Sequence, residues 1–149
     1  MTWTPESRIL NSALPPSTRL RGVCPCELMA WSDALLSSGH DYSLDFSDQI
    51  PEGDRIVEVL ATATGGSVAW NSIFGTKATA WVQWSQAGMQ SISFDIVLAS
   101  GATLSASGWV SVGCRTTGLP PTAPEYAPND CVFWGVILPD ANGNPLIFG

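Results

Sequence analysis

The sequence predicts a mainly β protein, an antiparallel β-sandwich in a single domain. Apolar and polar residues alternate at a period of two from about residue 40 to residue 113, which is the pattern of half-buried strands. Turns that contain glycine or proline separate these strands at the spacing of roughly 8 to 12 residues that a sandwich requires. No strand is followed by a crossover helix, and this excludes a parallel α/β sheet.

Six short strands are expected in this region. The first places Tyr42, Leu44 and Phe46 on one face and polar residues on the other. In each of the other five, the apolar residues again share one parity and are expected to face the core. These residues are Val57, Val59, Ala61 and Ala63; Val68, Trp70 and Phe74; Ala78, Ala80 and Val82; Ile92, Phe94, Ile96 and Leu98; and Leu104, Ala106, Val110 and Val112.

The first 38 residues have a different pattern and are expected to form an arm with short helices. Thr4, Pro5 and Glu6 give a capping residue, a proline at the first helical position and an acid in the first turn, so a helix is predicted toward Asn11. A second helix is predicted over residues 27–38, because apolar residues recur there at helical spacing and Gly39 is placed to end it.

The segment after residue 113 is rich in proline, which leaves little room for regular structure. Two apolar runs, 132–138 and 146–148, flank a turn built on Asn142-Gly143-Asn144, and Asn-Gly is a favoured hairpin dipeptide. A terminal hairpin is therefore expected. The chain divides into three parts: an N-terminal arm (1–38), a sandwich (39–113) and a C-terminal loop and hairpin extension (114–149).

Charge is scarce and mostly negative. Charged residues make up 13% of the chain, against about 25% in a typical domain. The net charge is -7, and the chain has six Lys and Arg residues in all. Nucleic-acid binding is not expected, because affinity for the phosphate backbone needs clustered basic side chains. No apolar run reaches the ~18 to 20 residues of a membrane span, and no secretory signal opens the chain, so no membrane is expected as a partner and the chain is expected in a cytosol.

Half of the positive charge lies in the first 21 residues, at Arg8, Arg19 and Arg21. An acid-rich segment follows from Glu27 to Glu58. Complementary fields of this kind help partners or neighbouring copies find register, which makes the three arginines candidate partner-binding residues. An ordinary solvated face is the alternative.

No catalytic or metal-binding motif is recognisable, and neither a cofactor nor a catalytic residue is expected. His40 is the single histidine, so a base or a ligand set has one candidate, and a capping or surface role is favoured. The acids from Asp41 to Asp54 do not have the spacing of a calcium loop. Because Asp41 and Asp45 share the polar parity of a strand, they are expected on a solvated face.

The four cysteines do not form a metal-ligand pattern. Cys24 and Cys26 flank one proline and so lack the two-residue spacer of zinc knuckles, while Cys114 and Cys131 stand alone. Reduced and mostly buried thiols are expected, and no metal.

Seven tryptophans are the most unusual feature of the composition. Trp70 is expected in the core by parity. Trp81 and Trp109 fall on the polar parity of their strands, among serine, threonine and glutamine. Either they are exposed aromatic anchors of a binding surface, or arms of the same chain cover them.

The middle of the chain resembles the small immunoglobulin-like proteins of tailed phages that serve as fiber-tail adaptors or tail structural proteins. The resemblance covers about residues 40–113 and rests on strand and turn patterns. These are 41–47 (DYSLDFS), 51–56 (PEGDRI), 81–82 (WV), 86–90 (QAGMQ), the strand 91–97 and 99–101 (ASG).

This resemblance implies an immunoglobulin-like fold and a non-enzymatic virion role as a tail, neck or fiber adaptor component. Such a protein is made in the host bacterial cytoplasm, resides in the virion, and binds other virion proteins and copies of itself, here through its arms. Residues 1–38 and 114–149 depart from the family pattern. Three alternatives stay open: a capsid decoration protein, a carbohydrate-binding module that stacks sugars on Trp81 and Trp109, and, weakest, a hydrolase using the acids near Asp45.

Overall fold

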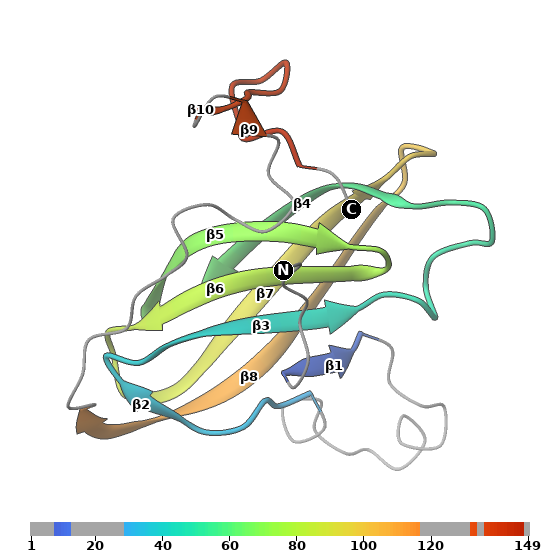
Figure 1. The fold of residues 1–149 in the computed structure, drawn as a ribbon. Helices are drawn as coiled ribbons and strands as arrows, with labels where there is room; N and C mark the ends of the chain where they lie inside the picture. The colour runs from blue at the N-terminus through green and yellow to red at the C-terminus, as the bar shows by residue number, and fades with distance from the viewer. Residues whose placement is uncertain (1–7, 13–28, 117–131, 134–135, 148–149) are drawn as a thin grey trace, which may run out of the picture.

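The structure, a computed structural model, describes residues 8–12, 29–116, 132–133 and 136–147. Two four-stranded sheets pack face to face, which confirms the predicted mainly β sandwich (Figure 1). The strands are β1 (Ile9–Asn11), β2 (Ala34–Leu36), β3 (Gly39–Asp45), β4 (Ile56–Ala63), β5 (Gly66–Phe74), β6 (Lys77–Trp84), β7 (Gly88–Leu98), β8 (Thr103–Thr116), β9 (Val132–Phe133) and β10 (Val136–Ile137).

The first sheet has the order β1-β3-β6-β5 and the second has the order β2-β8-β7-β4. The six predicted strands are β3 to β8, and every pairing among them is antiparallel. β1 and β2 lie on one side of the sandwich, and the edge strands β4 and β5 lie on the other (Figure 1). The two sides therefore differ: an N-terminal strand borders each sheet on one side, and a two-stranded β9–β10 pair stands beyond the other.

The core lies between the sheets and follows the predicted alternation. Nearly all apolar residues expected to face inward on β3, β6, β7 and β8 are buried or half-buried. The largest fully buried side chains of this core are Trp84, Tyr42, Phe46, Phe94, Leu44, Ile92, Ile96, Leu98, Val82 and Val110.

Two β-bulges remove Val57 on β4 and Trp70 on β5 from the core positions predicted for them. The register shifts between Ile56 and Glu58, and Val57 is left 43% exposed instead of facing the core. The register shifts again between Val68 and Trp70, so Trp70 lies opposite Trp81 and not in the core. A bulge adds one residue to one strand, and because side chains alternate, the residues after it change face relative to those before it. In β4 the bulge removes only Val57 from the predicted inward set, since Val59 and Ala61 are buried as predicted.

The predicted N-terminal helices are wrong wherever the structure describes them. Ile9–Asn11 pairs in parallel with β3, and Ala34–Leu36 pairs in parallel with β8. Before β2, the Trp31 N–H donates to the Trp109 C=O at 2.9 Å, and the Trp109 N–H donates to the Met29 C=O at 2.7 Å. A helix of about ten residues is marginal by itself, whereas a sheet edge offers backbone partners, so pairing prevails over helical spacing.

The C-terminal turn forms where the sequence placed it. The carboxylate of Asp140 accepts hydrogen bonds from the backbone N–H groups of Asn142 and Asn144, at 2.8 and 2.9 Å. Gly143 has φ of 86°, in the left-handed region that favours glycine. Leu146 N–H then donates to Leu138 C=O at 2.7 Å, which closes the turn. The preceding apolar run is itself folded, because β9 pairs with β10.

Candidate functional site

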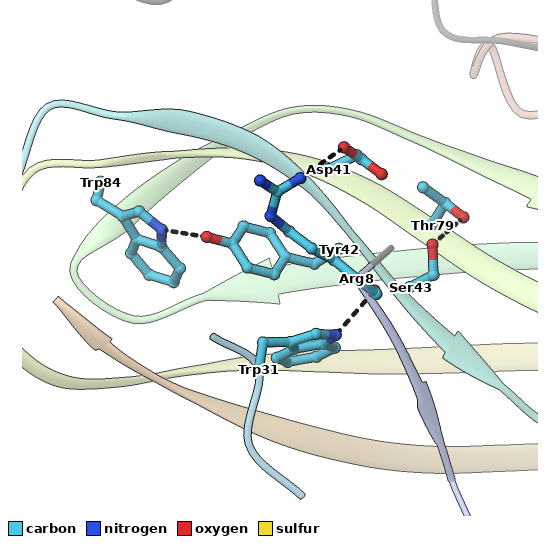
Figure 2. A network of polar contacts seen from close by, with 7 residues as sticks. All are labelled: Arg8, Trp31, Asp41, Tyr42, Ser43, Thr79 and Trp84. Carbon is cyan, nitrogen blue, oxygen red and sulfur yellow. Dashed lines mark hydrogen bonds and ion pairs between the residues drawn. The ribbon is translucent and has the colours of Figure 1, made fainter. Parts of the chain in front are cut away.

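An aromatic network fixes the N-terminal segment to the core. Figure 2 shows Trp31, Tyr42 and Trp84 in sequence across the sandwich, with successive rings edge to face at 5.4 and 5.8 Å. Trp84 Nε1 donates to the Tyr42 hydroxyl at 2.9 Å, and both residues are almost fully buried. Burial raises the pKa of the Tyr42 phenol above its ordinary value, although the bond from Trp84 opposes the rise. This network is structural in character.

Arg8 contributes to the same network mainly through its backbone. Its carbonyl accepts from Trp31 Nε1 at 3.0 Å (Figure 2) and from Ser43 N–H at 2.9 Å. These two bonds connect the start of β1 to the Trp31 segment and to β3. Its guanidinium lies 3.5 Å from the carboxylate of Asp41. Arg8, predicted as a partner-binding residue, is therefore already engaged within its own chain.

A row of hydroxyl side chains on the outer face of the first sheet is fully buried. Ser43, Thr79 and Ser72 sit side by side on β3, β6 and β5, and each has 0% exposure. Ser43 and Thr79 hydroxyls share a hydrogen bond of 2.7 Å (Figure 2). Alternation alone would place this row in solvent. The outer face of the first sheet is thus closed to solvent at this row.

Trp81 and Trp109 do not share a surface. Trp81 is half-buried on the outer face of the first sheet, with its ring 6.3 Å from that of Trp70. Trp109 is half-buried on the second sheet, opposite Ser91. The two rings therefore cannot stack against one sugar chain as a single platform.

The outer face of the second sheet is open and rich in hydroxyl groups. Ser93 and Ser107 hydroxyls lie 2.8 Å apart, and Ser105 donates to the carboxylate of Asp95. Met89 is 60% exposed near Trp109. This face is more open than the buried row of Ser43, Thr79 and Ser72 on the first sheet.

A groove lies at the side of the sandwich where β4 and β5 diverge into different sheets. Its volume is about 730 Å³, within the range of about 300 to 1,000 Å³ that is usual for binding pockets. The two strands form its floor, and the C-terminal turn region forms a wall. The lining residues are Val57, Glu58, Val59, Leu60, Ala61, Val68, Ala69, Trp70, Asn71, Ile137, Asp140, Asn144, Pro145, Leu146 and Ile147.

Exposed apolar side chains gather around this groove. Val57 and Leu60 on β4 are 43% and 57% exposed, and Leu146 on the wall is 39% exposed. None of these residues is predicted as a functional candidate from the sequence. A signal was present for Leu60, which is a large apolar residue on the parity opposite to buried Val59 and Ala61.

The titratable groups do not assemble into a metal centre in the part of the chain that the structure describes. No group of three or more His, Cys, Asp or Glu side chains converges among those residues. His40 packs edge to face on Tyr42, and burial, followed by the charge of Arg8, lowers its pKa. No helix within the described ranges is long and apolar enough to cross a bilayer.

Two carboxylates act as turn anchors. Burial opposes ionisation of Asp45, yet hydrogen bonds from Ser47 and Thr76 lower its pKa overall. Asp54 accepts from the Ser100 hydroxyl at 2.5 Å, and this bond is the main reason that its pKa is lowered. Asp45 is half-buried, not freely solvated as the alternation predicted.

The remaining predicted residues divide by location. Cys114 is a free and exposed thiol, which corrects the expectation of burial for this cysteine. Arg19, Arg21, Cys24, Cys26 and Cys131 lie outside the described residues.

No protein-family model matches the sequence, and no curated protein matches it. Among solved structures, a cysteine protease inhibitor from Entamoeba histolytica is similar at 9% identity and a TM-score of 0.40. The match covers 71% of this chain and 94% of the inhibitor.

Proposed function

We propose that this chain is a non-enzymatic structural protein of a bacteriophage virion, a tail, neck or fiber adaptor component that binds other virion proteins. The observation that supports it best is the groove beside β4, an edge strand among the described residues, where exposed apolar side chains gather. Contiguous exposed apolar surface is characteristic of protein interaction sites. The low charge content fits a protein that is covered by neighbours.

The strand order supports the immunoglobulin-like part of this proposal. The order β1-β3-β6-β5 opposite β4-β7-β8 is similar to the strand order of the two sheets of a constant-type immunoglobulin domain, although β1 pairs in parallel with β3. β2 extends the second sheet beside β8. This topology is a scaffold that hosts many functions, so the role still depends on the surface that it presents.

The direct test is to measure whether purified virions contain this protein. Virions of the phage that carries this sequence are purified through a density gradient, and the protein is quantified by mass spectrometry against the major capsid protein. A fixed stoichiometry in tail or neck fractions is the expected result. Recovery only in capsid fractions would favour a decoration protein, and absence from particles would overturn the virion role.

Carbohydrate binding is a second candidate, and the open hydroxyl-rich face around Trp109 favours it. Aromatic rings among hydroxyl groups are suited to stacking on sugars. Trp109→Ala should then abolish binding on a glycan array, whereas Trp81→Ala, on the opposite sheet, should leave it unchanged. Equal loss in both variants, or no binding by the unaltered protein, would eliminate this candidate.

A further inference from the structure

β4 is an edge strand of the second sheet. β4 pairs with β7 on one side and has no strand on the other in the described part of the chain. One side of its backbone therefore presents donors and acceptors without strand partners, which is a template for an added strand. β1 and β2, by contrast, already border the opposite edges of the two sheets.

The chemistry of the groove beside this edge is apolar and acidic. Its lining includes two carboxylates, Glu58 and Asp140, and no Lys, Arg or His. Glu58 is exposed, and no ion pair with it occurs among the residues described. Asp140 is oriented by its own turn, since the amides of Asn142 and Asn144 hold one carboxylate oxygen. A ligand with positive charge would therefore meet acids and no basic side chain in the lining of this groove.

A strand on β4 would present its side chains alternately to two environments. One set would enter the groove toward Val68 and Leu146, and the other would lie beside Leu60 on the outer face. Both environments contain apolar side chains, and Glu58 on β4 is available to a basic side chain of the added strand. Main-chain bonds supply affinity in this mode, and the alternate side chains supply specificity.

We propose that the β4 groove binds an extended segment of a partner protein that alternates apolar and basic residues, as an additional strand of the second sheet. This inference rests on the proposed function and deepens it, since it names the binding site and the chemistry of the partner. The net charge of -7 adds a general attraction for such a segment.

The test uses the full-length protein and a blocked, fluorescent hexapeptide, Lys-Val-Lys-Val-Lys-Val, in an anisotropy titration. Binding that weakens as salt rises is expected. Two control peptides define the mode: Glu-Val-Glu-Val-Glu-Val reverses the charge, and N-methylation of every residue of the lysine peptide removes the main-chain donors along both edges. Neither control should bind. Equal binding of the acidic peptide would overturn the proposal.

Matched variants locate the site. Glu58→Lys should weaken peptide binding at least about fivefold, since it replaces an attraction with a repulsion. Glu52→Lys makes the same change of net charge at an exposed position outside the groove lining and should have a much smaller effect. Equal effects of the two variants would show general electrostatic attraction only and would contradict a site at β4.

Hydrogen exchange then identifies the edge. The bound peptide should protect amides of β4 and leave those of β2 unchanged. Protection of β4 that grows with protein concentration without peptide would show that a second copy is the occupant, and this would overturn the proposal. Peptide binding and particle composition are separate measurements, so a protein that is present in virions but does not bind the peptide refutes this inference alone.

Discussion

Trp31 occupies the space that a side chain on Gly108 would need. A Cβ atom on Gly108 would lie 2.9 Å from Cε3 of Trp31 and closer still to Cζ3. Trp31 comes from the N-terminal segment and is 5% exposed, while Gly108 faces inward on β8. The absence of a side chain at one residue thus permits an indole ring from a distant segment to join the core.

Gly108→Ala should therefore lower the free energy of unfolding by about 2 to 3 kcal/mol, because the ring cannot move without disturbing its bond to Arg8. Trp31→Ala should cost about 3 to 5 kcal/mol through the cavity it leaves. In the double variant the alanine no longer meets the ring, so the combined cost should be smaller than the sum. Urea denaturation measures all three.

Gly113→Ala is the matched control on the same strand. A Cβ there would meet only the carbonyl oxygen of Ala34, at an ordinary contact distance of 3.7 Å. The change in unfolding free energy should stay within about 0.5 kcal/mol. Comparable losses in Gly108→Ala and Gly113→Ala would show that the contact with Trp31 is not the cause.

The hydrogen bond between Trp84 and Tyr42 gives a second prediction. Tyr42→Phe removes the acceptor and leaves the buried Trp84 N–H without it, so the free energy of unfolding should fall by about 1 to 3 kcal/mol. The pKa of Tyr42 is raised in the folded state. The stability that the protonated phenol contributes is therefore fully present below the ordinary pKa of 10.0 and is lost as the pH rises above it. The alkaline loss of stability should therefore be smaller in the variant, measured by denaturation between neutral pH and pH about 11. An unchanged alkaline slope would contradict this assignment.

Much of the sandwich was predictable because alternation is a local property. The inward set from Ile92 to Leu98 is buried as the sequence indicated. The bulge before Trp70 was not predictable, since one extra residue in a strand has no distinctive composition. The β4 groove could not be predicted from the sequence either, because it is lined by two diverging strands together with residues of the C-terminal turn. For Trp31 a signal did exist: a glycine inside a strand often marks a close approach, and Gly108 is one.

The hydrogen bonds of Asp54 predict that acid destabilises the turn before β4. Its carboxylate accepts from the hydroxyl and the backbone N–H of Ser100, which joins two turns. Because these bonds lower its pKa, the stabilisation is present above the ordinary value of 3.8 and is lost as pH falls below it. Asp54→Asn should reduce the dependence of the thermal midpoint on pH between about 4 and 2. Ser100→Ala removes the strongest donor and should reduce that dependence in the same direction; an effect in only one variant would argue against the pair.

Substitution of Arg8 tests whether its side chain or its backbone holds β1 in place. Arg8→Ala removes an ion pair whose side chains are 31% and 16% exposed but keeps the carbonyl that binds Trp31 and Ser43. The unfolding free energy should change by less than about 1 kcal/mol, and β1 amides should keep their protection from hydrogen exchange. Loss of protection in β1 would show that the guanidinium, and not the backbone, holds this strand.

The extent of the folding unit is the last prediction. A chain limited to residues 39–113 matches the sandwich expected from the sequence, yet it lacks β1, β2 and three core residues, Met29, Trp31 and Ala34. It would leave an edge of each sheet bare and expose the ring of Tyr42 that Trp31 covers. We expect this fragment to bind hydrophobic dyes and to lack a cooperative thermal transition, whereas the full chain should unfold cooperatively. A cooperative transition in the fragment would show that the N-terminal segment is an accessory arm. Near-ultraviolet circular dichroism, which reports fixed tryptophan packing, would distinguish these two outcomes independently of dye binding.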